Sequence, residues 1–189
     1  TTGADNVAVG RDALGANTTG YNNAAFGRTA LGSNTTGTYN TALGFSAGAS
    51  VTTTGGHTAI GGLALTSATS GTNNTAIGFQ ASRYLTTGDN NTAIGYLTLG
   101  GTGVVTGDNN TAVGASALKA NTTGASNTAM GHESLKANTT GGSNVAVGLA
   151  SLVYNTTGAS NTAVGTLALI NNTTASNNTA LGYNTLYAN

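Results

Sequence analysis

The chain has 189 residues, of which only 5% are charged, and it contains 30 Gly but no Pro, Cys or Trp. A soluble domain usually carries about 25% charged residues. Without Cys the chain has no disulfide framework and no thiolate metal site. A formal net charge of zero gives no electrostatic footprint for nucleic acid or an anionic membrane. No apolar run reaches the ~18 residues that a membrane-spanning helix needs, so we expect no nucleic-acid partner and no membrane insertion.

One short unit recurs along the whole chain and closes each time in the Gly of a phrase whose commonest form is Asn-Thr-Ala-x-Gly. Nine of the ten intervals between these glycines are 17 residues long, and the tenth is 19 because of an insertion around 100–106. A fixed period of this kind is typical of a solenoid, so we predict one repeat domain over residues 1–189. The closing glycines are Gly10, Gly27, Gly44, Gly61, Gly78, Gly95, Gly114, Gly131, Gly148, Gly165 and Gly182.

Each unit begins with an amide position, four residues before the closing Gly. When coils stack in register, equivalent Asn side chains form a ladder of hydrogen-bonded amides. The position holds Asn in ten copies and His in one, and we predict a structural ladder of Asn6, Asn23, Asn40, His57, Asn74, Asn91, Asn110, Asn127, Asn144, Asn161 and Asn178.

A short strand follows the amide position, as in Thr75-Ala76-Ile77. Alternation places Ala76 on the face opposite Thr75 and Ile77, and Gly78 then permits a turn into a second strand that contains Ala81. We expect the apolar residue before Gly and the Leu four residues after it to fill the interior, with the Ala row outward against another copy. The residues expected to be buried are Leu14, Leu31, Leu118, Leu135, Leu152, Leu169, Val9, Ile60, Ile77, Ile94 and Val147.

Two strands and two turns per unit predict an all-β fold, a parallel β-solenoid of eleven coils of about 17 residues. At about 4.8 Å per coil the rod is roughly 50 Å long. The invariant small row predicts close packing of a second copy, so we expect a homo-oligomer about the fibre axis.

The middle of the chain departs from the regular pattern. Val51, Ala68 and Leu85 replace the Asn of the closing Asn-Thr-Thr-Gly turn, and the Gly100–Thr106 loop is longer than its equivalents. Insertions in solenoids map to loops on one face, often the binding face, and we expect any ligand surface there. The candidate surface contacts are Tyr84, Tyr96 and Phe79.

Catalysis requires a cluster of reactive groups, and the charged residues are scattered over separate coils. We therefore predict no enzyme, no cofactor and no metal site. Asp89 and Asp108 are interpreted as turn caps. Three copies of His57 could meet at a threefold axis and hold an ion, or His57 could simply replace one ladder Asn. The stacked Thr pairs suggest ice binding as a further possible function. Adjacent Thr side chains, however, point to opposite faces of a strand and so do not form one flat Thr surface.

Two phrases carry a resemblance to known families. Asn6–Gly10 and Asn144–Gly148 resemble the head repeats of YadA-like trimeric autotransporter adhesins, which implies a left-handed β-roll and a homotrimer. The longer phrase from Asn110 to Gly124 is similar to shaft repeats of phage tail fibres, of the kind that precede an intramolecular chaperone domain. The adhesin heads have a shorter repeat, which leaves the handedness open.

We therefore interpret the chain as a structural fibre shaft, or as a receptor-binding or adhesive segment similar to a phage tail fibre, on a virion or in the extracellular space. The alternative is a bacterial extracellular adhesin or a self-assembling surface filament, with ice binding third. The expected partners are other copies and a host surface glycan or receptor. Thr1–Gly3 and Asn189 match the two parts of one turn, which predicts that copies stack end to end or that the repeat continues.

Overall fold

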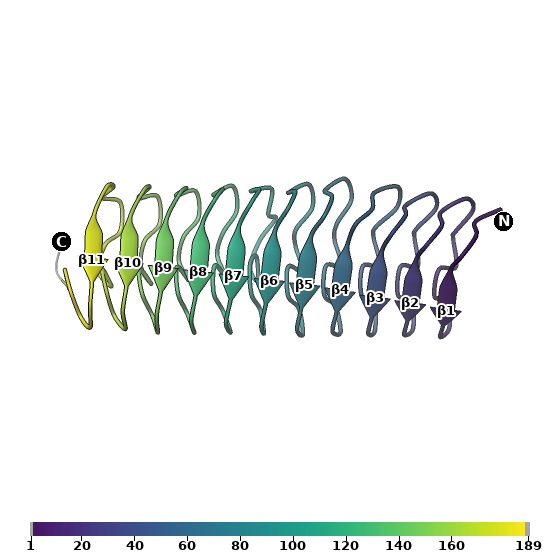
Figure 1. The fold of residues 1–189 in the computed structure, drawn as a ribbon, viewed down its shortest axis with the longest axis horizontal. Coiled ribbons are helices and arrows are strands. Elements are labelled where there is room, and N and C mark those ends of the chain that lie inside the picture. Colours follow the sequence, from purple (N-terminus) through teal and green to yellow (C-terminus); the bar gives the residue numbers. More distant parts are fainter. Residues whose placement is uncertain (1, 188–189) are drawn as a thin grey trace.

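The computed structural model describes residues 2–187, so Thr1 and Asn189, and the end-to-end contact expected of them, lie outside it. The protein is an all-β parallel solenoid in which eleven strands form one sheet in sequence order (Figure 1). Residues 2–187 include no helical segment of the length and hydropathy that a bilayer span requires. The strands are β1 Val7–Val9, β2 Ala24–Phe26, β3 Thr41–Leu43, β4 Thr58–Ile60, β5 Thr75–Ile77, β6 Thr92–Ile94, β7 Thr111–Val113, β8 Thr128–Met130, β9 Val145–Val147, β10 Thr162–Val164 and β11 Thr179–Leu181.

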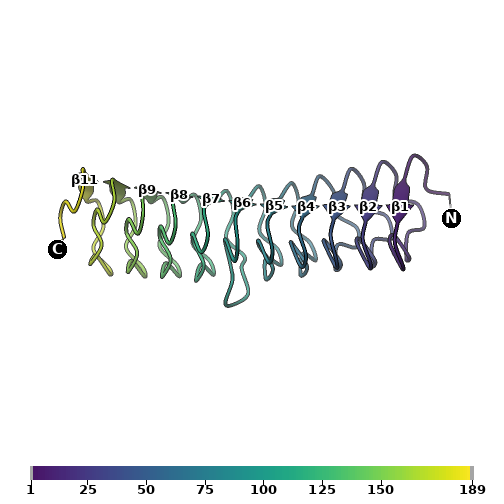
Figure 2. The ribbon, with the colours of Figure 1, turned by 90° about the horizontal axis from the view of Figure 1, so that it is seen from below.

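Each strand pairs with the next so that equivalent positions of the repeat lie side by side. Ala76 of β5 is opposite Ala93 of β6, and Ala93 is in turn opposite Ala112 of β7, although 19 residues separate these two. The longer interval therefore does not shift the register. Its extra residues leave the stack as a loop, which projects between β6 and β7 on the side of the rod away from the strands (Figure 2).

The interior confirms the predicted Leu positions, but the face of each strand that points into the core is the opposite of the predicted one. The six predicted Leu residues are all buried, and from Ala25 to Ala180 the Ala row lies inside the coils at 0–3% exposure. The apolar residues beside Ala point outward: Val9 is 55% and Ile94 38% exposed, and the other three predicted for the core are half-buried. Those residues are Ile60, Ile77 and Val147. The prediction that Ala faces outward is therefore wrong.

The narrow cross-section of the coil explains this orientation. The buried Leu, together with a small residue just before it such as Ala117, already fills the space behind the strand. Only a methyl group fits opposite them, because protein interiors pack without voids or overlaps. A branched side chain at the Ala position would overpack the core, and such overpacking costs about 1–3 kcal/mol.

The far side of each coil also differs from the prediction. Between residues 2 and 187 each coil contains one three-residue strand, not two, because two residues after each closing Gly adopt left-handed backbone. In the seventh coil these are Ser116 (φ 59°) and Leu118 (φ 50°). They break the extended conformation while keeping bonds between coils, as from the amide of Leu118 to the carbonyl of Ser134 at 3.0 Å. A non-Gly residue in this region costs roughly 1–2 kcal/mol, and burial of Leu118 offsets that cost.

In two coils a small residue replaces the core Leu, and an apolar residue three positions later fills the space. Where Leu is replaced by Gly48, the position three residues later holds Val51 in place of Asn, and where it is replaced by Ser82, that position holds Leu85. Val51 and Leu85 are both fully buried. Val51 and Leu85 therefore preserve packing in the two coils that lack the usual Leu, whereas Ala68 lies in a coil that keeps Leu65.

The closing glycines allow successive coils to touch backbone to backbone. Gly114 has φ +129°, and a Cβ added to it would lie 2.6 Å from the carbonyl oxygen of Gly131 in the next coil. Any side chain would push the coils apart and would also strain the backbone. This position therefore requires Gly for both reasons.

Replacing Gly114 by Ala should lower the free energy of unfolding by about 3 kcal/mol or more, because backbone strain and overlap with Gly131 add together. Gly103→Ala is the matched control, since a Cβ on Gly103 meets nothing within 4 Å. Denaturant unfolding of both variants measures the difference. Equal stability of the two variants would contradict the close stacking of Gly114 on Gly131.

Candidate interaction surface

A buried ladder of Asn side chains holds the coils in register. The Oδ1 atom of Asn110 accepts the backbone amide of Asn127 at 3.0 Å and its side-chain amide at 3.2 Å. The Asn127 side chain also donates to the carbonyl of Gly141 at 2.9 Å. Each such Asn thus binds the coil before it and closes the turn of its own coil. Equivalent bonds link Asn6, Asn23, Asn74, Asn91, Asn144, Asn161 and Asn178.

His57 occupies one rung of this ladder, between Asn40 and Asn74. Its amide donates to Oδ1 of Asn40 at 3.0 Å, and its Nδ1 accepts the amide of Asn74 at 3.3 Å. With Nδ1 accepting, the proton of the neutral ring is on Nε2, which lies 3.1 Å from Oγ1 of Thr54. Burial lowers the pKa of His57, against opposing contributions from the backbone of Gly71 and Asn74. At 1% exposure inside the coil, His57 cannot meet its copies at a threefold axis.

A second ladder of Asn runs through the closing turns at both ends of the rod. Asn138 donates its side-chain amide to Oδ1 of Asn121 at 3.0 Å and to the carbonyl of Gly141 at 2.9 Å. The ladder stops where Val51 follows Asn34, and Oδ1 of Asn34 is left buried without a partner. The coils with Val51 and Leu85 thus keep an apolar side chain in the core but lack the amide bonds of this second ladder.

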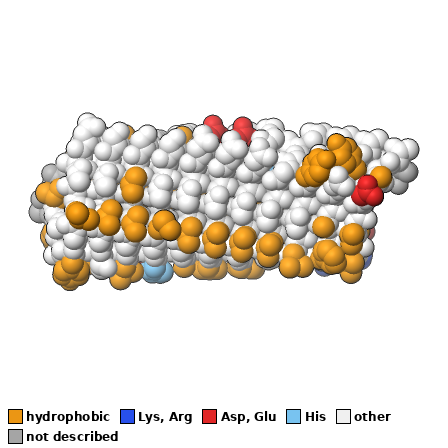
Figure 3. Space-filling view, viewed as in Figure 1, with side chains coloured by type: hydrophobic (Ala, Val, Ile, Leu, Met, Phe, Trp, Pro, Cys, Tyr) orange, Lys and Arg blue, Asp and Glu red, His pale blue; other side chains and the backbone are white. Residues whose placement is uncertain are grey.

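The outward face of the sheet carries a continuous apolar row. One residue of each strand, the one before the closing Gly, points away from the core, and these side chains form a line along the rod (Figure 3). Six of them are at least 38% exposed, including Leu43 at 50% and Met130 at 44%. Monomeric proteins rarely expose apolar patches larger than a few hundred Å², and larger patches mark interaction sites. The row consists of Val9, Phe26, Leu43, Ile60, Ile77, Ile94, Val113, Met130, Val147, Val164 and Leu181.

A second exposed row begins one residue further along, directly after the closing Gly. Phe79 and Tyr96 occupy it on adjacent coils, with parallel rings whose centroids are 6.2 Å apart, and both are about half exposed. Tyr84, the third predicted contact, lies elsewhere in its coil with the Arg83 guanidinium 5.0 Å over its ring. Two of the three predicted surface aromatics are thus brought together, and they adjoin the apolar row.

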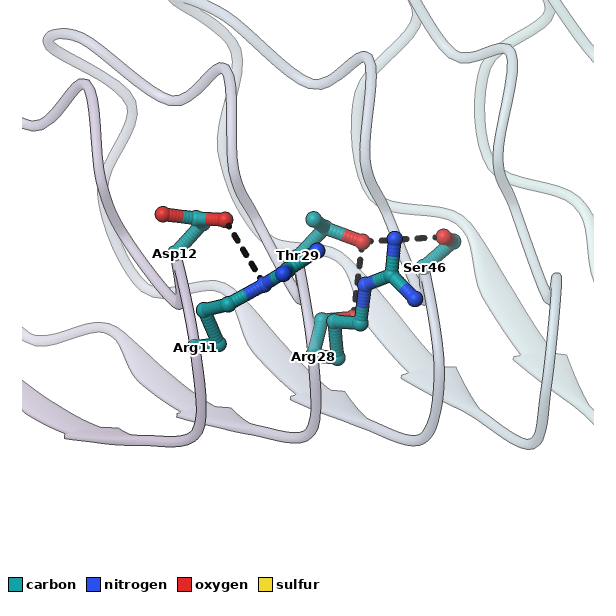
Figure 4. Close-up of polar contacts among 5 residues, drawn as sticks. All are labelled: Arg11, Asp12, Arg28, Thr29 and Ser46. Atoms are coloured by element: carbon teal, nitrogen blue, oxygen red, sulfur yellow. Dashed lines mark hydrogen bonds and ion pairs between the residues drawn. The ribbon is translucent and has the colours of Figure 1, made fainter.

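The same row is charged at its N-terminal end (Figure 4). Arg11 pairs with Asp12 at 3.4 Å on an exposed surface, and the Arg28 guanidinium lies 5.6 Å over the ring of Phe45. Thr29 donates to the carbonyl of Arg28 at 2.7 Å. Exposed ion pairs of this kind contribute little to stability, whereas Arg28 covers part of the aromatic surface of Phe45.

The remaining polar residues singled out from the sequence act within the backbone. Oδ1 of Asp89 accepts the amide and the hydroxyl of Thr72, and Asp108 accepts the amide of Asp89 at 2.8 Å. Within residues 2–187, no group of three or more His, Asp or Glu side chains could hold a metal ion. Both carboxylates thus cap turns of the preceding coil.

Comparisons with known proteins add no assignment to this surface. The chain matches no family model, and neither a curated protein nor a solved structure is found to match it.

Stability should fall on mild acidification because of His57. The pKa of folded His57 lies below its ordinary value of 6.5, so the unfolded chain binds the extra proton first. The contribution of neutral His57 is therefore complete above about pH 6.5 and is lost as the pH falls toward the folded pKa, with a slope of up to about 1.4 kcal/mol per pH unit. Protonation would also place an N–H on Nδ1 against the amide of Asn74.

His57→Asn restores the amide used in the other ten copies and should remove this pH dependence, as measured by urea unfolding between pH 5 and pH 8. His132→Asn, at an exposed position, is the control and should leave the slope unchanged. A slope that survives in His57→Asn would show that another group causes it.

Proposed function

We propose that the protein is a non-enzymatic segment of a surface fibre, in which parallel copies pack against one another through the apolar row. The single observation that carries this proposal is the row itself: it runs the length of the rod, and every rung of it lies outside the core. A repeat that keeps an apolar residue outward in all eleven strands fits a partner with the same period. Another copy of this chain has that period because its sequence is identical.

The size of the row supports an assembly of this kind for a long rod. Eleven three-residue strands make a strip of roughly 50 by 10 Å, or about 500 Å². If about half is apolar, its burial contributes roughly 6 kcal/mol per copy at ~25 cal/mol per Å². Association costs about 4–15 kcal/mol, and that cost is incurred once while each added coil extends the contact. Affinity should therefore increase with the number of coils.

No charge repulsion opposes this contact between copies. The chain carries five Lys or Arg and five Asp or Glu, with zero formal net charge, and no member of the apolar row is charged. Copies arranged about one cyclic axis keep their coils at the same height, whereas a perpendicular twofold would reverse the chain direction. We propose a left-handed coil and a homotrimer on the resemblance to the adhesin heads.

The fibre would stand on a virion as a tail-fibre shaft, with a cell-surface adhesin or filament as the alternative. The repeat is compatible with either role, because its recurrent positions serve the stacking of coils and the contact between copies, and none of them marks a particular ligand. The flanking sequence of the full gene separates them: an intramolecular chaperone domain favours the phage role, and a membrane anchor or sorting signal favours the cell.

Ice binding has one observation in its favour, the outward Thr of strands such as β5 and β6 beside the apolar row. The Thr pairs of the turns are poor candidates, because their first hydroxyl is bonded to the next coil, as from Thr122 to the carbonyl of Thr139 at 2.9 Å. A face packed against other copies is also closed to ice. Thermal hysteresis of the purified protein tests this function.

Ile77→Lys combined with Val113→Lys should dissociate the assembly, because two unpaired charges would be buried in an apolar contact. The wild type should have the mass of a trimer by sedimentation velocity at micromolar concentration, and the double variant should be a folded monomer. Thr123→Lys with Thr140→Lys, at exposed turn positions, is the matched control and should remain trimeric. A monomeric wild type, or dissociation of the control alone, would refute the proposed contact.

A further inference from the structure

A cleft of about 340 Å³ lies beside the inserted loop. The loop projects from the side of the rod away from the strands (Figure 2), so the cleft remains open when the sheet faces of several copies meet. Its volume is within the range of small-ligand sites, about 300–1,000 Å³. It therefore has room for one or two sugar rings.

Two raised walls and a low floor form the cleft. One wall is the inserted loop, which lies on the seventh coil through a bond from the amide of Gly101 to the carbonyl of Lys119 at 2.8 Å and contributes Thr102 to the lining. The opposite wall is Tyr154, which is 54% exposed. Ala120 and Ala137 line the coils between them. Small residues between these two walls leave the hollow open.

The chain places both of its lysines in this cleft. Lys136 pairs with Glu133 at 2.7 Å, whereas Lys119 lies in no ion pair among the described residues. The hydrogen bond from Lys136 holds the pKa of Glu133 below its usual range, with smaller contributions from His132 and Lys119. The cleft thus carries two cations and one anion at neutral pH, with Lys119 available to a ligand.

We propose that this cleft binds a saccharide that carries a carboxylate, such as a uronic or sialic acid residue of a surface glycan. Lys119 pairs with the carboxylate, Tyr154 packs against the apolar face of the ring, and Glu133 and Thr102 bind hydroxyl groups. The inference deepens the proposed fibre role by naming its ligand class, and it rests on that role only for the origin of the glycan.

The composition of the cleft favours an acidic sugar over other anions. A free phosphate would need more than one unpaired cation, because Lys136 is already engaged by Glu133. The aromatic wall and the apolar Val153 beside it give a bare inorganic anion nothing to contact. An acidic sugar offers one charge, several hydroxyls and an apolar ring face, which matches these groups.

The test is titration of the full chain with trigalacturonate, followed by NMR and calorimetry, with maltotriose and inorganic phosphate as the neutral and simple-anion controls. Trigalacturonate should shift the resonances of the cleft, and neither control should. Lys119→Gln should weaken binding about tenfold or more, and Tyr154→Ala about three- to tenfold. Tyr39→Ala, at an exposed aromatic remote from the cleft, should have no effect.

Glu133→Gln tests whether the charge of the cleft governs binding, because Glu133 is the only acidic residue among those that line it. It should tighten trigalacturonate several-fold without creating affinity for maltotriose. Failure of trigalacturonate and sialyllactose to bind, or equal binding of phosphate, would overturn the inference. The mass of the same samples is measured separately, so that loss of saccharide binding in an intact trimer refutes the cleft and not the fibre.

Discussion

The structure depends on a buried Asn side chain that forms hydrogen bonds between coils, in addition to those formed by the backbone. In each regular rung one Asn accepts two hydrogen bonds from the next coil and donates to both the preceding coil and its own turn, as Asn110 and Asn127 do with Gly124 and Gly141. An unpaired buried amide costs about 1–3 kcal/mol, so every rung penalises a shift of register. This constraint keeps equivalent positions of successive coils in register, so that the closing glycines meet backbone to backbone.

The sequence predicted the period, the parallel stacking, the buried Leu residues and the positions of the ladder, because each of these follows from positions that recur in most copies of the repeat. It did not predict which face of the strand is inward. Alternation in Thr75-Ala76-Ile77 is symmetric, and only the width of the coil decides between the two faces. One signal in the sequence could have identified the inward face. Where Gly48 replaces the usual Leu, Val51 replaces Asn and is buried, which shows that the Leu and Asn positions fill the interior without the residue before Gly.

The lysine cleft was not predicted, for a different reason. Lys119, Glu133 and Tyr154 lie in three successive coils, and Lys119 and Lys136 are one 17-residue period apart. The period alone, however, does not show which variable positions line a hollow. The insertion at 100–106 drew attention to this part of the rod, but only the stacked coils show that Thr102 and Tyr154 line one cleft. The regular positions thus specify the rod, and departures from them create the features that a partner could recognise.

Amide hydrogen exchange at the ladder tests this account most directly. The backbone amides of Asn110, Asn127 and Asn144 lie just before strands and donate to a side-chain oxygen of the preceding coil at 2.9–3.0 Å. If the ladder holds the coils together, these amides exchange as slowly as those within the strands and only on unfolding. Exchange as fast as in the inserted loop, with the strands still protected, would contradict it.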